Sequence, residues 1–322
     1  MRLAKPFFQL PILFDVPRLQ AEIAALPPQA WVPHPDQVPG NSAARLISVQ
    51  GQETDAVHGQ MLATAWLEAL PYVRQVLAGF GVVWGRSRLM RLGAGAGVPE
   101  HADINYHWHT RVRLHIPITT QPAVRFHCDG QSVHMAAGEA WIFDNWRRHH
   151  VENNSEVERI HLVADTSGTA AFWRFACDAP PPREEWRTLA WAPESRPRLL
   201  TETHRPSPVM PAAEVQFLVE DLRSELVLVS DNADGRGRLT RFNQLMEAFV
   251  QDWRQLCALH GIGGQGRPEF QRLADAVRAA ATPLAAGLVM RTNQVNAMLV
   301  LEKRVLQHLV TDSPQPSPGR QT

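Results

Sequence analysis

The middle of the chain alternates between apolar and polar residues in the pattern of short β-strands. Between Arg111 and Ile118, one face carries Val112, Leu114, Ile116 and Ile118, and the other carries Arg111, Arg113 and His115. Asp129-Gly130 stands between two further strand patterns, residues 123–128 and 131–135, and tolerates the positive φ of a two-residue hairpin turn. Short strands separated by turns continue from about Arg86 to Asp165. This pattern favours a β-sandwich or barrel over a fold in which strands alternate with helices.

The segments on either side of these strands carry helical spacing. Before them, we expect a helix over residues 17–26 capped by Asp15, a short strand over 45–49 and a second helix over 55–73. After them, a Pro-rich stretch at 178–212 predicts an irregular connector. Beyond it, apolar residues from Leu239 to Leu256 line one helix that Gly261 ends, and residues 270–281 and 284–310 continue in the same manner. The tail, 313–322, is expected to be disordered.

Composition narrows the function classes. Lys+Arg and Asp+Glu both number 32, and a protein that binds nucleic acid through phosphates usually has a basic excess. Three widely spaced cysteines argue against a disulfide framework or a CxxC zinc site. No uncharged run approaches the roughly 18 residues that a membrane span requires. We therefore expect no nucleic-acid or membrane partner, and a cytoplasmic location.

Histidines are concentrated among the predicted strands, and two of them suggest a metal site. His101 and Asp103 are two residues apart, so in an extended chain both side chains project to the same face. With His149 from a distant strand, they would form the two-histidine, one-carboxylate triad of non-heme Fe(II) enzymes, which leaves positions open for substrate and oxygen. His-X-Asp alone is more often a chance occurrence than a metal site, so its surroundings decide.

Three more polar residues on nearby strands support a site. Arg159, ten residues after His149, offers a two-pronged donor for a carboxylate, although such an arginine is also common on a solvent-facing strand. Arg113 and His115 share a strand whose opposite face is apolar. Either these two side chains face water, or they line a polar cavity inside a barrel, which the neighbouring metal-ligand candidates favour.

The order of these motifs resembles the aspartyl/asparaginyl β-hydroxylase family and its bacterial relatives, the free L-proline hydroxylases. The residues that carry the resemblance are His101-Ala-Asp103, Arg113-Leu-His115-Ile-Pro, His134-Met-Ala-Ala-Gly138-Glu-Ala-Trp-Ile-Phe-Asp144, His149, Arg159 and Asp165. Members are 2-oxoglutarate- and Fe(II)-dependent oxygenases built on a double-stranded β-helix. The resemblance thus implies a mainly β fold with α-helices: a jelly-roll, cupin-like core with flanking N-terminal helices and a C-terminal all-α domain. The expected domains are a jelly-roll oxygenase domain, the connector, a helical domain and the tail, at 1–177, 178–212, 213–312 and 313–322.

The resemblance also implies roles for individual residues. His101, Asp103 and His149 match the iron ligands; His149 fits the alignment better than His150, which would point to the opposite face. Arg159 matches the arginine that pairs with the distal carboxylate of 2-oxoglutarate. Arg113 and His115 match a pair near the other end of this cosubstrate or the substrate, and Arg88 is a weaker candidate for a substrate carboxylate.

The function implied is hydroxylation of an unactivated C–H in an amino acid or amino-acid residue, with O2 consumed and succinate and CO2 formed. Asn105 and Trp108, in the segment after Asp103, are candidate substrate contacts, although the aromatic rings of this segment could equally serve packing alone. Trp146 precedes His149 in Trp-Arg-Arg and is another candidate, although such a sequence more often forms a solvated basic loop. The C-terminal helices are a candidate homodimer surface. Two alternatives stay open: a cupin-type metal protein that does not use 2-oxoglutarate, such as an isomerase or another dioxygenase, and a binding module without turnover.

Overall fold

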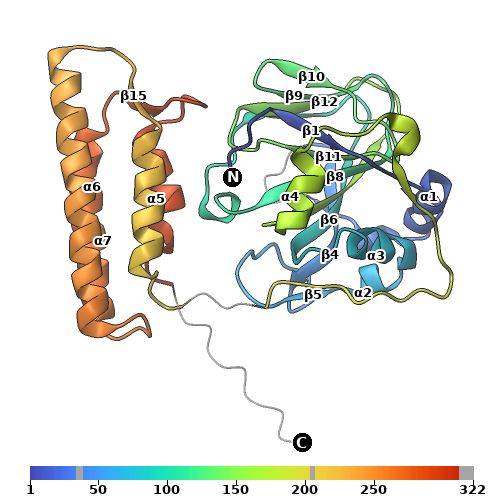
Figure 1. The fold of residues 1–322 in the computed structure, drawn as a ribbon, viewed down its shortest axis with the longest axis horizontal. Helices are drawn as coiled ribbons and strands as arrows, with labels where there is room; N and C mark the ends of the chain where they lie inside the picture. The colour runs from blue at the N-terminus through green and yellow to red at the C-terminus, as the bar shows by residue number, and fades with distance from the viewer. Residues whose placement is uncertain (34–38, 204–206, 312–322) are drawn as a thin grey trace, which may run out of the picture. The chain divides into compact units, whose positions relative to one another are not determined.

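The computed structural model describes residues 1–33, 39–203 and 207–311, which form two compact units. The described residues of the first unit are 1–33, 39–103 and 107–203, and those of the second are 104–106 and 207–311. Figure 1 shows the first as the β-rich part of the ribbon and the second as the helical part. Among the described residues, no helix is both long enough and apolar enough to cross a membrane.

Eight consecutive strands of the first unit form two facing sheets. They are β6 (Trp84–Leu92), β7 (Gly97–His101), β8 (Val112–Thr119), β9 (Val124–Cys128), β10 (Gln131–Val133), β11 (Ala140–Phe143), β12 (His149–Asn153) and β13 (Arg159–Thr166). The large sheet has the order β11-β8-β13-β6, and the small sheet has the order β10-β9-β12-β7. Numbered from one to eight, these strands lie in the orders 6-3-8-1 and 5-4-7-2. This is the double-stranded β-helix, and the predicted jelly-roll fold is confirmed.

Strands outside the jelly roll extend the large sheet at both edges. The added strands are β1 (Phe7–Leu10) beside β11, β4 (Asn41–Val49) beside β6, and β3 (Val32–Pro33) and β5 (Met61–Ala63), which both pair with β4. The short strand expected at 45–49 is the end of β4. Strands β8 and β13, which carry Arg113, His115 and Arg159, are already the two inner strands of the jelly-roll part of this sheet, and the additions protect its outer strands β11 and β6.

Each face of the large sheet has a different environment. The apolar residues of β8, Val112, Leu114, Ile116 and Ile118, belong to the main hydrophobic core, together with residues of the N-terminal helices. The opposite face points toward the small sheet, where the ring of His115 contacts Phe126 of β9 edge-on, with ring centroids 5.4 Å apart. Arg113 and His115 therefore line the inside of the barrel, as the second of the two interpretations predicts.

The hairpin and the first helix follow their predicted signals. Asp129 and Gly130 have φ values of 50° and 74°, which is the conformation that a two-residue turn between β9 and β10 requires. Helix α1 (Val16–Ala24) begins after Asp15, whose side chain accepts a hydrogen bond from the Arg18 backbone N–H. Both features arise from short-range interactions, which the sequence displays directly.

The prediction of one helix over residues 55–73 is wrong. The segment forms strand β5 and then two short helices, α2 (Ala65–Glu68) and α3 (Pro71–Ala78). Residues 61–63 pair with β4, so long-range strand pairing outweighs the local helical spacing. The two helices are separate because Thr64 caps α2 and Pro71 opens α3 at its first turn, where a proline is tolerated.

The described part of the Pro-rich stretch up to Leu199 packs against the first unit. After helix α4 (Ala170–Cys177), a short strand, β14 (Arg187–Leu189), pairs in parallel with β2 (Ile12–Phe14). Leu189, Trp191 and Leu199 then contact the main core. The stretch contains little regular structure, yet it covers part of the jelly roll.

The second unit is built mainly of helices: α5 (Ala212–Ser224), α6 (Ala233–His260), α7 (Arg267–Leu284) and α8 (Ala297–Arg304). Gly261 ends α6 with a φ of 69°, as predicted. The continuous helix expected over 284–310 is wrong, because residues 288–290 form β16, which pairs with β15 (Leu226–Leu228). Residues 312–322, which hold the predicted disordered tail, lie outside the described residues.

Four short 3-10 helices are also present among the described residues: η1 (Pro28–Ala30), η2 (Tyr106–Trp108), η3 (Arg183–Glu185) and η4 (Leu306–His308).

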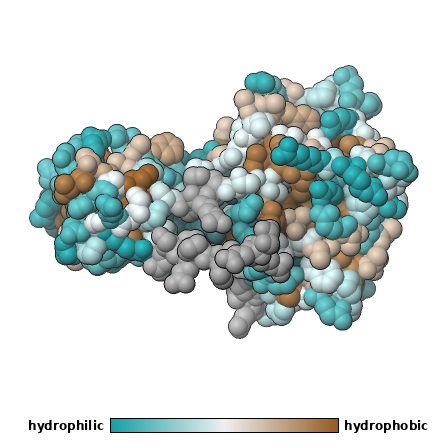
Figure 2. Space-filling view, turned by 90° about the horizontal axis from the view of Figure 1, so that it is seen from below, coloured by the Kyte–Doolittle hydropathy of each residue, from teal (hydrophilic) through white to brown (hydrophobic). Residues whose placement is uncertain are grey.

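On the face that Figure 2 shows, hydrophobic areas are small and lie among hydrophilic side chains. Such mixed surfaces are normal for folded proteins and indicate no particular partner. The homodimer surface in the C-terminal region stays a prediction.

Candidate metal centre and buried arginine clusters

The three candidate metal ligands converge at one end of the small sheet. His101 is the last residue of β7 and His149 is the first of β12, and the antiparallel pairing places them directly opposite each other. Their ring centroids are 4.2 Å apart, and Nε2 of His101 lies 4.0 Å from Oδ1 of Asp103. One ligand atom from each of the three residues lies within 4.8 Å of the other two. The arrangement brings two imidazoles and one carboxylate around a single point.

Backbone contacts orient these ligands. Nδ1 of His101 lies 2.8 Å from the carbonyl oxygen of Pro99, and Nδ1 of His149 lies 2.9 Å from that of Arg147. An Nδ1–H donated to a carbonyl leaves Nε2 with a free lone pair for a metal. The backbone N–H of Asp103 donates to the carbonyl oxygen of Asn145 at 2.9 Å. The loop before β12 therefore fixes two members of the triad.

The environment of His149 suits a metal ligand. Burial lowers the pKa of His149 to about 4, although Asp103 opposes the shift. The imidazole is thus neutral at physiological pH, which is the form that binds metal. His150 projects from the other face of β12, where it lies opposite His127. The geometry favours His149 over His150 as the third ligand of this site.

A second group of buried residues lies on the barrel side of β8 and β13. Arg159 donates from Nη2 to Nδ1 of His161 at 2.6 Å, and the His161 ring lies 5.8 Å from that of His115. All three side chains are almost completely buried. Burial lowers the pKa of Arg159 to about 9, and burial together with Arg159 holds the pKa of both histidines well below the usual range.

Several polar atoms of this group, which consists of Arg159, His161 and His115, form no hydrogen bond. Four of its buried nitrogen atoms have no hydrogen-bond partner among the described residues: Nε of Arg159, Nε2 of His161 and both ring nitrogens of His115. No ion pair links Arg159 to a carboxylate in the described part of the chain. Buried polar groups of folded proteins are almost always paired. An unpaired cluster with a buried guanidinium therefore fits an anionic ligand that binds there.

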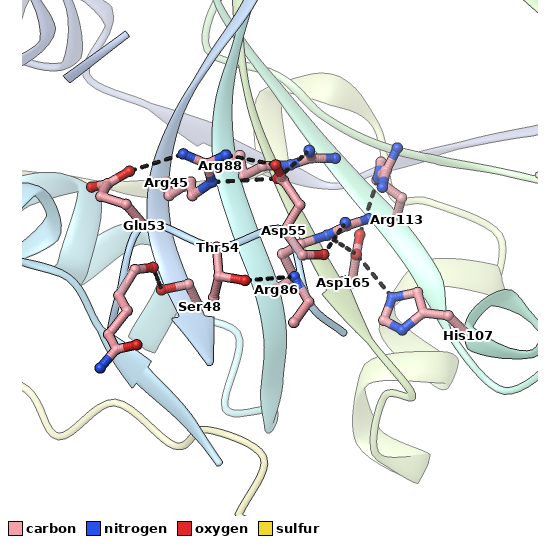
Figure 3. A network of polar contacts seen from close by, with 12 residues as sticks. Arg45, Ser48, Glu53, Thr54, Asp55, Arg86, Arg88, His107, Arg113 and Asp165 are labelled. Carbon is pink, nitrogen blue, oxygen red and sulfur yellow. Dashed lines mark hydrogen bonds and ion pairs between the residues drawn. The ribbon is translucent and has the colours of Figure 1, made fainter. Parts of the chain in front are cut away.

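A third group of charged residues surrounds Asp165 of β13, and Figure 3 shows how they point toward one another. Arg113 donates from Nε to Oδ1 of Asp165 at 3.0 Å, and Nε2 of His107 lies 3.1 Å from Oδ2. Burial alone would raise the pKa of the Asp165 carboxyl, but Arg113 and His107 more than offset this effect and hold it well below its usual range. The carboxylate is thus charged and fully engaged.

Arg88 belongs to the outer part of the same network. It lies on β6 next to Arg45 of β4, and both arginines reach Asp55: Nη1 of Arg88 at 3.5 Å and Nη2 of Arg45 at 2.5 Å. Burial and the neighbouring arginines lower the pKa of Arg88 to about 9. Arg45 also donates from Nη1 to Oε2 of Glu53 at 2.9 Å, so two carboxylates face these two arginines. The role of Arg88 near an anionic substrate group stays a prediction.

The remaining substrate candidates lie in different surroundings. Trp108 is buried, and the guanidinium of Arg113 stacks 4.2 Å from the centre of its ring. Trp146 is completely buried, so it belongs to the core beside the triad and offers no open surface to a substrate. Asn105 is exposed and falls within the three-residue segment Ile104–Tyr106 that packs with the second unit. In that unit the ring of Tyr106 stacks on His308.

Two residues of this region were missed by the sequence analysis. His161 follows Arg159 by two positions on the same strand, so the alternation of strand side chains was sufficient to find it. Asn145 is completely buried, and neither atom of its side-chain amide has a hydrogen-bond partner in the described residues. Nothing in the local sequence distinguishes Asn145, because only the fold places it behind Asp103.

The jelly-roll part of the chain is similar to a known protein family. Residues 57–168 match the family described as aspartyl/asparaginyl β-hydroxylase. The resemblance inferred from the motifs is confirmed. The matched segment contains the complete jelly roll and all three residues of the triad, so this part of the chain is similar to the hydroxylase domains of that family. No curated protein matches the sequence.

Solved structures of oxygenases and cupins are among those similar to the chain. A 2OG-Fe(II) oxygenase family oxidoreductase from Burkholderia pseudomallei has a TM-score of 0.35 at 16% identity, covering 48% of this chain and 78% of its own. A prolyl-4-hydroxylase from Pseudomonas putida has a TM-score of 0.35 at 14% identity, covering 52% and 95%. A cupin domain from Bordetella pertussis has a TM-score of 0.21 at 19% identity, covering 25% and 79%. These TM-scores and identities are low, and the order of the strands in the two sheets is what establishes the double-stranded β-helix.

Proposed function

We propose that the first unit is a 2-oxoglutarate- and Fe(II)-dependent dioxygenase that hydroxylates an amino acid or an amino-acid residue of a peptide. The observation that carries the proposal is the unpaired cluster of Arg159, His161 and His115 next to the metal triad. Phe143 links the two groups, since its ring contacts both His149, at 4.8 Å, and His115, at 5.4 Å. A dicarboxylic keto acid has one end that binds a metal and another end that needs a cation.

The residues of the chain divide the work of binding accordingly. His101, Asp103 and His149 would hold Fe(II) and leave positions open beside it. Arg159 would pair with the distal carboxylate of 2-oxoglutarate, held in place by its contact with His161. His115 would donate a hydrogen bond to the same cosubstrate from the floor of the barrel. The iron and its cosubstrate supply the oxidising power for the C–H bond, and the protein supplies geometry and a guarded cavity.

The aromatic residues between the sheets protect this chemistry. Phe126 and Phe143 pack against His115 and His149, and with Phe7 and Val151 they form an apolar layer between the sheets. An apolar layer of this kind excludes water from the space between the metal triad and Arg159. The low polarity of that space strengthens the electrostatic attraction between Arg159 and a carboxylate.

The substrate side of the proposal rests on the charged network around Asp165. Arg113 lies close enough to the triad for the Asp103 carboxylate to raise its pKa. Arg113 and Arg88 are therefore our candidates for contacts to an anionic group of the substrate, with Trp108 as the aromatic wall beneath Arg113. Asn105 is a further candidate because it follows Asp103 so closely in the chain. Trp146 is retained only as a packing residue.

The main alternative is a cupin-type protein that binds a metal without 2-oxoglutarate. Such a protein has no use for a buried arginine without a carboxylate, because an unpaired buried charge destabilises the fold. A binding module without turnover has no need of a complete metal triad, and His101, Asp103 and His149 are all present. Arg159 and its unpaired neighbours thus favour the oxygenase over the first alternative, and the complete triad favours it over the second.

A screen for succinate release tests the proposal. The protein is incubated with Fe(II), 2-oxoglutarate and O2, together with free amino acids or small peptides in turn. We expect succinate formation to rise above the substrate-free rate for at least one amino-acid substrate, with a product heavier by one oxygen atom. A protein that binds iron yet neither binds nor consumes 2-oxoglutarate would contradict the proposal.

A further inference from the structure

The outer face of the small sheet carries a second group of potential metal ligands. His127 on β9 and His150 on β12 are directly opposite each other in the antiparallel register. Their rings are nearly parallel, at 3°, with centroids 4.2 Å apart. Glu152 is two residues after His150, so its side chain projects from the same face of the strand. Three ligand-type side chains thus share one patch, on the face of β12 opposite to His149.

The distances within this patch suit an ion better than direct hydrogen bonds. Nε2 of His127 lies 3.6 Å from Oε2 of Glu152, and Nε2 of His150 lies 3.8 Å from Oε1. Both separations exceed the range of a hydrogen bond. Zinc binds imidazole nitrogen and carboxylate oxygen at about 2.0–2.2 Å, so an ion between these atoms would be in reach of all three. The three ligand atoms lie within 4.8 Å of one another.

One nitrogen of the patch has no other use in the described structure. Nε2 of His127 is buried and has no hydrogen-bond partner. The cation nearest in register, Arg125, lies opposite Glu152, but it donates to Oγ and the carbonyl oxygen of Ser132, both at 3.1 Å. The amide of Asn154 donates to Oε2 of Glu152 at 3.1 Å, and a bond of this kind orients a metal-binding carboxylate.

We propose that His127, His150 and Glu152 bind a divalent transition-metal cation, most simply Zn²⁺. Two histidines and a glutamate are a ligand set that zinc uses in proteins, with a fourth position open to water. The ligand side chains are partly exposed, at 27%, 31% and 46%, so the ion exchanges with solvent. It bridges β9 and β12, and it stabilises the folded chain because the unfolded chain lacks the assembled site.

Zinc binding to variants of the full chain tests this site separately from the iron site. The probe is Zn²⁺ alone, added to protein from which metal has been removed by a chelator, with stoichiometry and affinity measured by calorimetry. The His101→Ala variant disables the triad, and Glu152→Gln disables the outer patch while preserving side-chain shape. Glu156→Gln is the matched control, because Glu156 is an exposed carboxylate on the loop that follows β12.

We expect two equivalents of zinc at micromolar concentration in the unaltered protein and in Glu156→Gln, and one equivalent in each site variant. The double variant binds none, and zinc raises the unfolding temperature of His101→Ala but not that of the double variant. A single equivalent that His101→Ala abolishes would overturn the outer site and leave the proposed function intact. Zinc that binds the outer patch only at millimolar concentration would also overturn the proposal, because it would be an adventitious ion only. If instead His101→Ala changes nothing and Glu152→Gln removes the ion, the triad fails and the outer site stands.

Discussion

Two clusters of buried charge lie on strands β8 and β13 inside the same barrel, and they differ in how well they are satisfied. Around Asp165, the carboxylate receives Arg113 on one oxygen and His107 on the other. Around Arg159, the guanidinium meets only a histidine, and four nitrogens of that cluster have no partner in the described structure. The Arg159 cluster, Asp165 and His107 are almost fully buried, whereas the side chain of Arg113 is 17% exposed.

The difference separates structural from ligand-binding polar residues. A buried charge with a well-placed counter-charge is part of the fold, and removal of one partner destabilises the protein. A buried charge without a counter-charge lowers stability by itself, so its presence indicates a ligand that completes it. We therefore assign Asp165 to the support of the site and Arg159 to the site itself. Variants of each cluster should have opposite effects on stability and on ligand binding.

The largest expected effect comes from the triad beside both clusters. His149→Ala should abolish Fe(II)-dependent turnover, since it removes one of the three residues proposed to hold the metal. The matched control is His150→Ala, on the opposite face of β12, which should keep turnover. Turnover and iron content are measured together. Loss of turnover in His150→Ala with retention in His149→Ala would reverse the ligand assignment.

Asp165→Asn should produce the next largest effect, on stability. Arg113 and Arg86 lose their counter-charge, and His107 loses its charged hydrogen-bond partner. We expect the free energy of unfolding to fall by about 3–5 kcal/mol at neutral pH. Because the folded-state pKa of Asp165 is lowered, its contribution is present above the unfolded-state pKa of about 4 and is lost as pH falls below it. The deficit of the variant in urea unfolding should therefore shrink below about pH 4. A deficit that grows in acid would contradict this assignment.

Arg159→Ala should reverse that pattern. Without its cationic partner, 2-oxoglutarate should bind about 100-fold more weakly, as expected for a buried charge pair that loses one member. Iron binding should remain, and stability without 2-oxoglutarate should be unchanged or higher, because an uncompensated buried charge has been removed. The KM for 2-oxoglutarate and the unfolding free energy are compared in one preparation. Unchanged cosubstrate dependence would remove Arg159 from this role.

His161→Ala should have the smallest effect of the four. His161 acts on the cosubstrate through Arg159, so its loss should raise the KM for 2-oxoglutarate by about tenfold, the equivalent of one good hydrogen bond. His161→Gln, which keeps an acceptor near the guanidinium, should recover part of the loss. An equal fall of kcat with unchanged KM in both variants would show that His161 does not position Arg159.

The strands and the triad were predictable because their signals are local or ordered along the chain. The alternation from Arg111 to Ile118 reports a strand with two different faces, and the Asp129-Gly130 turn fixes the register of the hairpin that follows. The metal triad was recognised from the spacing of His101 and Asp103 and from the order of the later motifs. The jelly-roll topology itself came from the family resemblance, since alternation alone does not distinguish a sandwich from a barrel.

The parts that sequence reasoning missed depend on contacts between distant segments. Residues 61–63 form a strand because β4 offers an edge to pair with, and residues 288–290 do so because β15 lies beside them. Asn145 is buried behind Asp103 only in the folded chain. Whether Arg113 and His115 faced water or a cavity was open until the small sheet was seen to cover them.

The most direct test of the account is an anaerobic titration of the iron-loaded protein with 2-oxoglutarate, followed by visible absorption. We predict a weak band that saturates at one equivalent, the signature of a keto acid bound through both oxygens to Fe(II). The same band in Arg159→Ala should require about 100-fold more 2-oxoglutarate. Absence of the band from protein that has bound iron would contradict the claim that the unpaired cluster of Arg159, His161 and His115 exists to hold this cosubstrate.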